Sequence, residues 1–104
     1  MITQVRTAAV HDGKFPEAIE FGLKVVAYIN DKFPELNAQL VRNIGGPLYE
    51  LHWVSTTETL ASYDDLGKRL EADQGYQELV AEIRQAGVFV ASSLVDHLYE
   101  TISG

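Results

Sequence analysis

Residues 40–51 decide the fold, and they read Leu40-Val41-Arg42-Asn43-Ile44-Gly45-Gly46-Pro47-Leu48-Tyr49-Glu50-Leu51. Two successive glycines between apolar runs are typical of a tight β-hairpin turn, and a proline just after it fits the first position of a strand or an edge strand. We therefore expect a strand over 37–44 to fold back on a strand over 48–55. With Gly45 and Gly46 as the two turn residues, the register pairs Arg42 with Tyr49, Val41 with Glu50, Leu40 with Leu51 and Gln39 with His52.

The same strand–helix–strand order is expected on both sides of this hairpin. Residues 2–10 are rich in small and β-branched side chains and end in a turn cluster at 11–13, and apolar residues then recur at helical spacing over 14–33. The helix must end there because Pro34 lacks the amide donor. After the second strand of the hairpin, a helix capped by Thr56, Thr57 or Thr59 is expected to run to Gly87 with a break near Gly75. Residues 88–102 supply the last strand, with an irregular start near Ser92 and Ser93.

This order predicts a ferredoxin-like α+β sandwich, βαββαβ, as one domain over residues 1–104. Its four-stranded antiparallel sheet would have the order 4-1-3-2, with both helices on one face. In the expected register, the helix side of the hairpin carries Leu40, Tyr49, Leu51 and Trp53. The other side mixes polar residues with Val41 and Val54, which is too apolar for a face exposed to water. A second copy stacked sheet on sheet would cover it, so we expect a homodimer.

Composition excludes several classes of function. The 104 residues carry a formal net charge of −7, which disfavours binding to nucleic acid and to anionic membrane surfaces. There is no cysteine, so disulfides, thiol nucleophiles and thiolate metal sites are absent, and no segment resembles an export signal. We expect a cytoplasmic protein. The three histidines lie on separate elements without metal-binding spacing, so neither a metal nor another cofactor is expected.

Two segments of the second half carry a family resemblance: Leu51-His52-Trp53-Val54-Ser55-Thr56-Thr57-Glu58-Thr59-Leu60 and Leu70-Glu71-Ala72-Asp73-Gln74-Gly75-Tyr76-Gln77-Glu78-Leu79. The strand that runs into a threonine-rich helix start, and the Leu-x-x-Asp-x-x-Tyr break in the helix, resemble the dimeric α+β barrel proteins, especially their NIPSNAP-like and stress-responsive groups. The resemblance implies a homodimer whose two sheets close into a barrel with a small cavity in each half. Gln74-Gly75 stands where those families commonly have proline and an acidic residue, and the ligand pattern of the haem-degrading barrels is missing.

Candidate catalytic residues are His52 and Glu50, which share one face of the strand over 48–55. A histidine with a carboxylate two residues away can act as a general base near neutral pH. The alternative is an ordinary interface histidine whose ring nitrogens are satisfied by hydrogen bonds. Arg6 lies in the middle of the neighbouring strand in this topology, so we expect it to form an ion pair with Glu50. If Arg6 lies in a cavity, it would instead bind a carboxylate or enolate of a ligand. The remaining candidate ligand-binding residues are Gln39, Trp53, His97 and Tyr99.

Which face of the first and last strands lines the barrel is left open by the sequence. Either His97 and Tyr99 or Asp96 and Glu100 must face the barrel side. Two functions remain open in turn. One is a small-molecule-binding barrel, for which the resemblance leaves open whether interior side chains also catalyse a cofactor-independent oxygenase or isomerase reaction. The other is a non-catalytic interaction or stress-associated module in which the same residues join two sheets.

Overall fold

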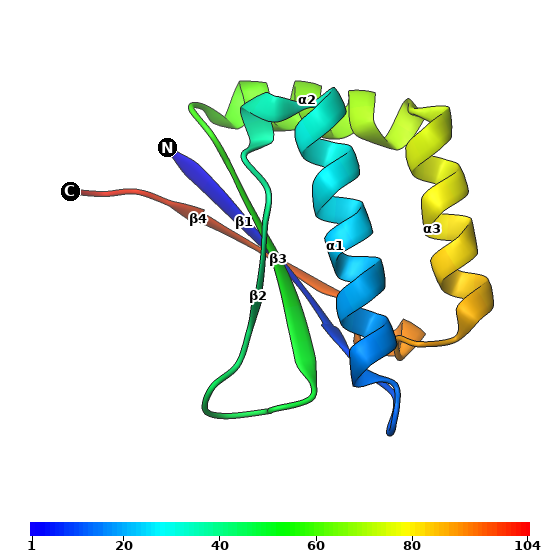
Figure 1. Ribbon diagram of the computed structural model, residues 1–104. Helices are drawn as coiled ribbons and strands as arrows, with labels where there is room; N and C mark the ends of the chain where they lie inside the picture. The colour runs from blue at the N-terminus through cyan, green and yellow to red at the C-terminus, as the bar shows by residue number, and fades with distance from the viewer.

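The computed structural model describes residues 1–104 and places the helices on one face of an antiparallel sheet (Figure 1). The chain runs through β1 (Ile2–Ala9), α1 (Phe15–Lys32), the 3-10 turn η1 (Pro34–Leu36), β2 (Gln39–Arg42), β3 (Glu50–Thr57), α2 (Leu60–Ala72), α3 (Gln74–Ala86), the 3-10 turn η2 (Ala91–Ser93) and β4 (Val95–Glu100). The strand order is β2-β3-β1-β4, which confirms the predicted ferredoxin-like α+β fold. In Figure 1, α1 and α3 run side by side and α2 crosses near one end of both.

The first helix forms as its apolar spacing predicts. Its buried residues, Ala18, Gly22, Val25 and Ile29, recur three and four apart and face the sheet. The helix ends at Lys32, before Pro34. Gly22 is needed where α1 crosses β2, because a Cβ there would lie 2.8 Å from Cδ2 of Leu40. The backbone of α1 therefore packs close against the sheet at Gly22.

The predicted break in the second helix is confirmed, and its centre is Asp73. Thr59, one of the three cap candidates from the sequence, caps α2 in a reciprocal capping box with Ser62. Asp73 has an extended backbone, ends α2 and caps α3 by accepting a hydrogen bond from the amide of Tyr76 at 2.9 Å. Gly87 ends α3 with φ +64°, the left-handed conformation expected of a C-cap glycine.

The predicted two-residue turn at Gly45 and Gly46 is wrong. Tight hairpin turns need a positive φ at their first central residue, and only Gly46, at φ +72°, has one. Instead, residues 43–49 form a longer loop in which the Asn43 amide donates a hydrogen bond to the carbonyl of Gly45 at 3.2 Å. The strand β2 is shorter than the predicted 37–44 at both ends, and β3 begins and ends two residues later than the predicted 48–55. The register becomes Gln39 with Val54, Leu40 with Trp53, Val41 with His52 and Arg42 with Leu51.

This register differs from the predicted one by two residues, so every side chain keeps its predicted face. Leu51 is almost fully buried under the helices, and Leu40 and Trp53 pack beside it. Tyr49 lies outside β3 and is 65 % exposed, with its ring edge-on to Phe15 at 6.2 Å. The opposite sheet face has no helix over it.

The last strand is shorter than the predicted 88–102. Phe89 makes only an isolated bridge to Val10, η2 follows, and regular pairing with β1 starts at Val95. The hydroxyl of Ser93 accepts from the amide of Ala9 and donates to the carbonyl of Val90, which turns the chain into β4. The irregular start expected near Ser92 and Ser93 is thus confirmed.

Candidate functional site

A cavity of about 740 Å³ lies between the sheet and the helices, a size within the range of roughly 300–1,000 Å³ for small-molecule sites. Fifteen of its nineteen lining residues are apolar, and the four others are Gln4, Arg6, Ser55 and Arg84. The sheet supplies three of the four polar residues, whereas α1 and α3 supply mainly apolar walls. Its lining residues are Gln4, Arg6, Ala8, Val25, Ile29, Leu36, Ala38, Trp53, Val54, Ser55, Leu70, Tyr76, Val80, Ile83, Arg84, Phe89, Val90, Ala91 and Leu94.

An ion pair between Arg6 and Asp96 stands at the floor of this cavity. The two residues are directly opposite in the β1–β4 register, and Arg6 donates from Nε to Oδ1 at 2.7 Å and from Nη2 to Oδ2 at 2.8 Å. This two-point contact lowers the pKa of the Asp96 carboxyl and raises the pKa of Arg6. Nη1 of Arg6 makes no hydrogen bond to the protein.

Tyr63 of α2 lies within the electrostatic field of this pair. Burial is the main cause that raises the pKa of its hydroxyl, and the charge of Asp96 adds to the shift while that of Arg6 opposes it. At neutral pH the phenol is therefore protonated and able to donate a hydrogen bond.

Trp53 forms the apolar centre of the cavity floor. It lies opposite Arg6 in the β1–β3 register and opposite Leu40 in the β2–β3 register. Its Nε1 donates to the carbonyl of Gly22 at 3.3 Å, and its ring meets Phe89 edge-on at 5.5 Å. The indole is thus fixed by α1 on one side and by the segment before β4 on the other.

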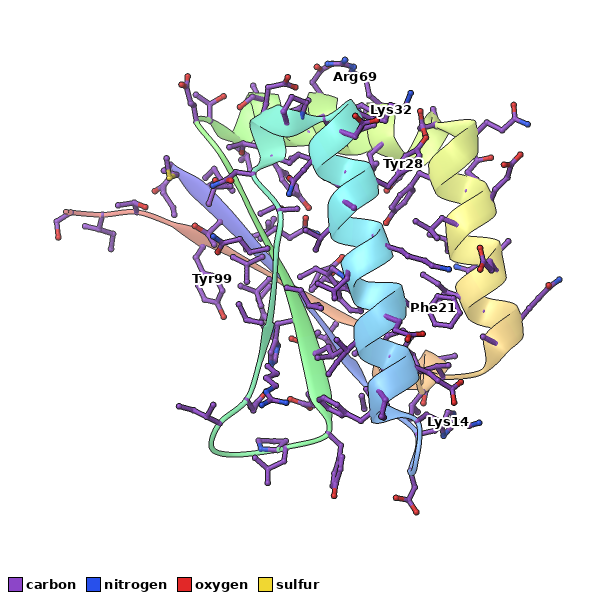
Figure 2. The ribbon with its side chains drawn as sticks, viewed as in Figure 1. Lys14, Phe21, Tyr28, Lys32, Arg69 and Tyr99 are labelled. Carbon is purple, nitrogen blue, oxygen red and sulfur yellow. The ribbon has the colours of Figure 1, made fainter.

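The other predicted site residues share the uncovered sheet face. Nδ1 of His52 is hydrogen-bonded to Oγ1 of Thr7 at 2.7 Å, and its Nε2 to Oδ1 of Asn43 at 2.5 Å. His97 and Tyr99 stack on the same face with ring centres 6.3 Å apart, and Tyr99 points away from the helices (Figure 2). The sequence left open which residues of the first and last strands face which side. In the structure, His97 and Tyr99 lie on the uncovered face, and Arg6 and Asp96 lie on the helix side.

Two predicted contacts are wrong. Arg6 does not pair with Glu50, because Arg6 points toward the helices and Glu50 lies opposite Ala9 on the other face of the sheet. Gln39 does not lie opposite His52, since the longer hairpin loop places Val41 there. The cavity accordingly joins Arg6 and Trp53, and the catalytic role predicted for Glu50 and His52 stays a prediction.

The sequence reasoning missed the remaining polar residues of the cavity, which are Gln4, Ser55 and Arg84. Only the structure separates the two rows of the first strand, because each row mixes small, polar and apolar residues. Ile2, Ala8 and Val10 form a buried row at alternate positions, and Gln4 and Arg6 belong to that row. Once Arg6 is assigned to this face, the antiparallel register leads to Asp96.

The structure contains neither a metal-binding cluster nor a helix that could span a membrane. No three His, Asp or Glu side chains gather in a way that could hold a metal ion. No helix combines the length and the apolarity needed to cross a bilayer.

Comparison with solved structures identifies the same architecture in several proteins. An uncharacterised NIPSNAP domain protein from Burkholderia xenovorans matches with a TM-score of 0.78 at 17 % identity, over 99 % of this chain and 96 % of that one. A NIPSNAP family protein of unknown function from Agrobacterium tumefaciens gives 0.78 at 17 %, over 97 % and 87 %. A proposed antibiotic biosynthesis monooxygenase from Deinococcus radiodurans gives 0.72 at 10 %, over 100 % and 95 %.

At the level of sequence, no protein-family model and no curated protein matches. The likenesses therefore rest on three-dimensional structure, and at these identities they establish the fold. The predicted resemblance to NIPSNAP-like α+β barrel proteins is confirmed at that level: this chain has the ferredoxin-like α+β fold of the NIPSNAP domain proteins.

Proposed function

We propose that this protein binds a small molecule with an apolar body and an anionic group in the cavity between the sheet and the helices. The observation that carries the proposal is the position of Arg6 in a mainly apolar cavity of about 740 Å³. The Arg6 side chain is 36 % exposed, and a guanidinium forms charge-assisted hydrogen bonds with a carboxylate, phenolate or enolate. Arg84, a second cation on the cavity wall, adds to the same preference.

We extend this proposal from ligand binding to catalysis. An arginine that holds an anion also stabilises the anion formed when a bound molecule loses a proton, which is the step shared by cofactor-independent isomerases and oxygenases. One of the similar folds belongs to a proposed antibiotic biosynthesis monooxygenase, which supports considering this chemistry.

The binding proposal is tested with Trp53, the only tryptophan of the chain, as the reporter. Titration with aromatic and medium-chain aliphatic carboxylates should change its emission, because Trp53 lines the cavity. Arg6→Met should weaken binding of a carboxylate by about tenfold or more, since a hydrogen bond to a charged group contributes about 1.5–3 kcal/mol. The corresponding neutral alcohol should lose much less.

Arg42→Met is the matched control, because Arg42 is exposed on β2 and does not line the cavity. Equal losses for Arg6→Met and Arg42→Met would contradict the proposed site. Equal losses for the carboxylate and the alcohol would contradict the anionic class of ligand.

We further propose that a second copy of the chain covers the open sheet face. Apolar side chains there are exposed to an unusual degree, with Val41 at 42 %, Val95 at 46 % and Tyr99 at 55 %. A second copy would enclose Gln39, His52, His97 and Tyr99 between two sheets. In the alternative function, a non-catalytic module, these residues join the two chains. Both ring nitrogens of His52 are already hydrogen-bonded, which favours a structural role at the interface for this histidine.

A further inference from the structure

We propose that α3 is a movable lid over the cavity and that the hydrogen bond from Tyr28 to Asp73 is the latch that holds it against α1. The inference deepens the proposed function, because it concerns how a ligand enters the same cavity. It rests on the position of α3, on the residues that bound it and on the contacts that hold it.

The third helix forms one wall of the cavity and is the least buried helix in the fold. Tyr76, Val80, Ile83 and Arg84 of α3 line the cavity. None of its thirteen residues is buried, whereas four residues of α1 and Leu66 of α2 are. A helix with little fully buried surface opens at a lower free energy than its neighbours.

Both ends of α3 are built as hinges. At its start, Asp73 has an extended backbone and separates α3 from α2, so α3 can move while Leu66 keeps α2 in the core. At its end, Gly87 takes the left-handed conformation and imposes no side chain on the following segment. Changes at a few residues that flank an element are the usual origin of lid motion.

The contact between Tyr28 and Asp73 joins α1 to the first hinge. The Tyr28 hydroxyl donates to Oδ2 of Asp73, the same oxygen that accepts from the amide of Tyr76 and caps α3. Gly75 makes this possible, because a Cβ there would lie 2.1 Å from the Tyr28 hydroxyl oxygen. In Figure 2, Tyr28 points from α1 toward the start of α3.

Other polar contacts between α1 and α3 are weak. Nζ of Lys24 and Oε1 of Glu82 are 3.6 Å apart, and both side chains are more than half exposed. An ion pair of this kind contributes little to stability in water. The Tyr28–Asp73 hydrogen bond is therefore the polar contact most able to set how often α3 opens.

The first experiment measures opening without a ligand. Hydrogen exchange should show the amides of α3 exchanging about three- to tenfold faster in Tyr28→Phe than in the unmodified protein, the effect of losing one hydrogen bond. Exchange in α1 and β3 should change much less. Tyr99→Phe is the control, because Tyr99 lies on the open face, away from α3. Equal acceleration in all elements, or none in α3, would overturn the lid.

The second experiment measures entry. The probe is 1-anilinonaphthalene-8-sulfonate, an aromatic anion, and its binding is followed in stopped flow by energy transfer from Trp53. Tyr28→Phe should raise the association rate. Because the chain has no cysteine, Lys24→Cys with Glu82→Cys can be cross-linked by a short bismaleimide to hold α3 on α1. Cross-linking should slow association by about tenfold or more relative to the same variant before cross-linking.

The outcomes separate the lid from the cavity. Normal binding with rates unaffected by Tyr28→Phe and by the cross-link would overturn the lid and leave the proposed binding site intact. Absence of probe binding in every variant, together with faster exchange of α3 in Tyr28→Phe, would support the movable helix and count against the proposed ligand class.

Discussion

Asp73 illustrates how much one side chain contributes in this fold. Its extended backbone ends α2, and its carboxylate caps α3 and accepts a hydrogen bond from the Tyr28 hydroxyl of α1. These hydrogen bonds favour the charged form, so the pKa of Asp73 is lowered, with Tyr28 as the main cause. The same bond raises the pKa of Tyr28 to about 12, because the hydroxyl must keep its proton to donate.

The Tyr28–Asp73 bond should stabilise the protein only within a window of pH. Asp73 has a lowered folded pKa, so its contribution is present above the usual value of 3.8 and is lost as the pH falls through the lower folded value. Tyr28 has a raised pKa, so its contribution is present below 10.0 and is lost as the pH rises toward about 12.

Urea unfolding of the unmodified protein and of Tyr28→Phe at several pH values measures this window. The stability difference between the two should be constant from about pH 5 to pH 9 and should shrink on both sides. Neighbouring charges at Asp31, Lys32 and Glu78 are common to both proteins. A difference that does not depend on pH would contradict the assigned hydrogen bond.

At the scale of elements, the junction between α2 and α3 depends on a glycine in the first turn of α3. Gly75→Ala should lower the free energy of unfolding by about 1–3 kcal/mol, because its Cβ would displace the Tyr28 ring. Gly67→Ala is the matched control within α2, where nothing lies within 4 Å of the added Cβ, and it should stabilise the protein by about 0.5–1 kcal/mol. Thermal or urea unfolding of the two variants gives the comparison, and equal effects would show that Gly75 has no special role.

The order and type of the elements were predictable because they follow from local signals. The spacing of Ala18, Gly22, Val25 and Ile29 predicts α1, and Pro34 ends it. The hairpin loop was not predictable in the same way. Gly45 and Gly46 permit several turns, and the choice of the longer loop shows only in the backbone and in the Asn43 hydrogen bond.

The cavity was less predictable than the fold, because the first strand has no clear apolar face. Its alternate rows both mix small, polar and apolar residues, so the direction of Arg6 depends on contacts made after folding. The same holds for β4, where the sequence offered Asp96 and His97 equally. Only the pairing of Arg6 with Asp96 across the β1–β4 register shows which row lines the cavity.

At the scale of the whole molecule, the open sheet face leads to a prediction about assembly. Light scattering after size exclusion should give twice the chain mass of 11.5 kDa. Val95→Asp should convert this dimer to a monomer, because it places a charge at an exposed apolar position that the second copy would cover. Leu23→Asp, at a leucine 54 % exposed on α1, should leave the mass unchanged. A monomeric unmodified protein would refute the proposed dimer.

The hydrogen bonds of His52 have a consequence for its protonation. Because the Asn43 amide nitrogen donates to Gly45, its oxygen faces the imidazole, so the neutral ring carries its proton on Nε2. Nδ1 is then the lone-pair nitrogen, and the hydroxyl proton of Thr7 points at it. If His52 ever removes a proton, the nearest one belongs to Thr7. In this tautomer the imidazole therefore accepts a hydrogen bond from Thr7, its partner across the β1–β3 register.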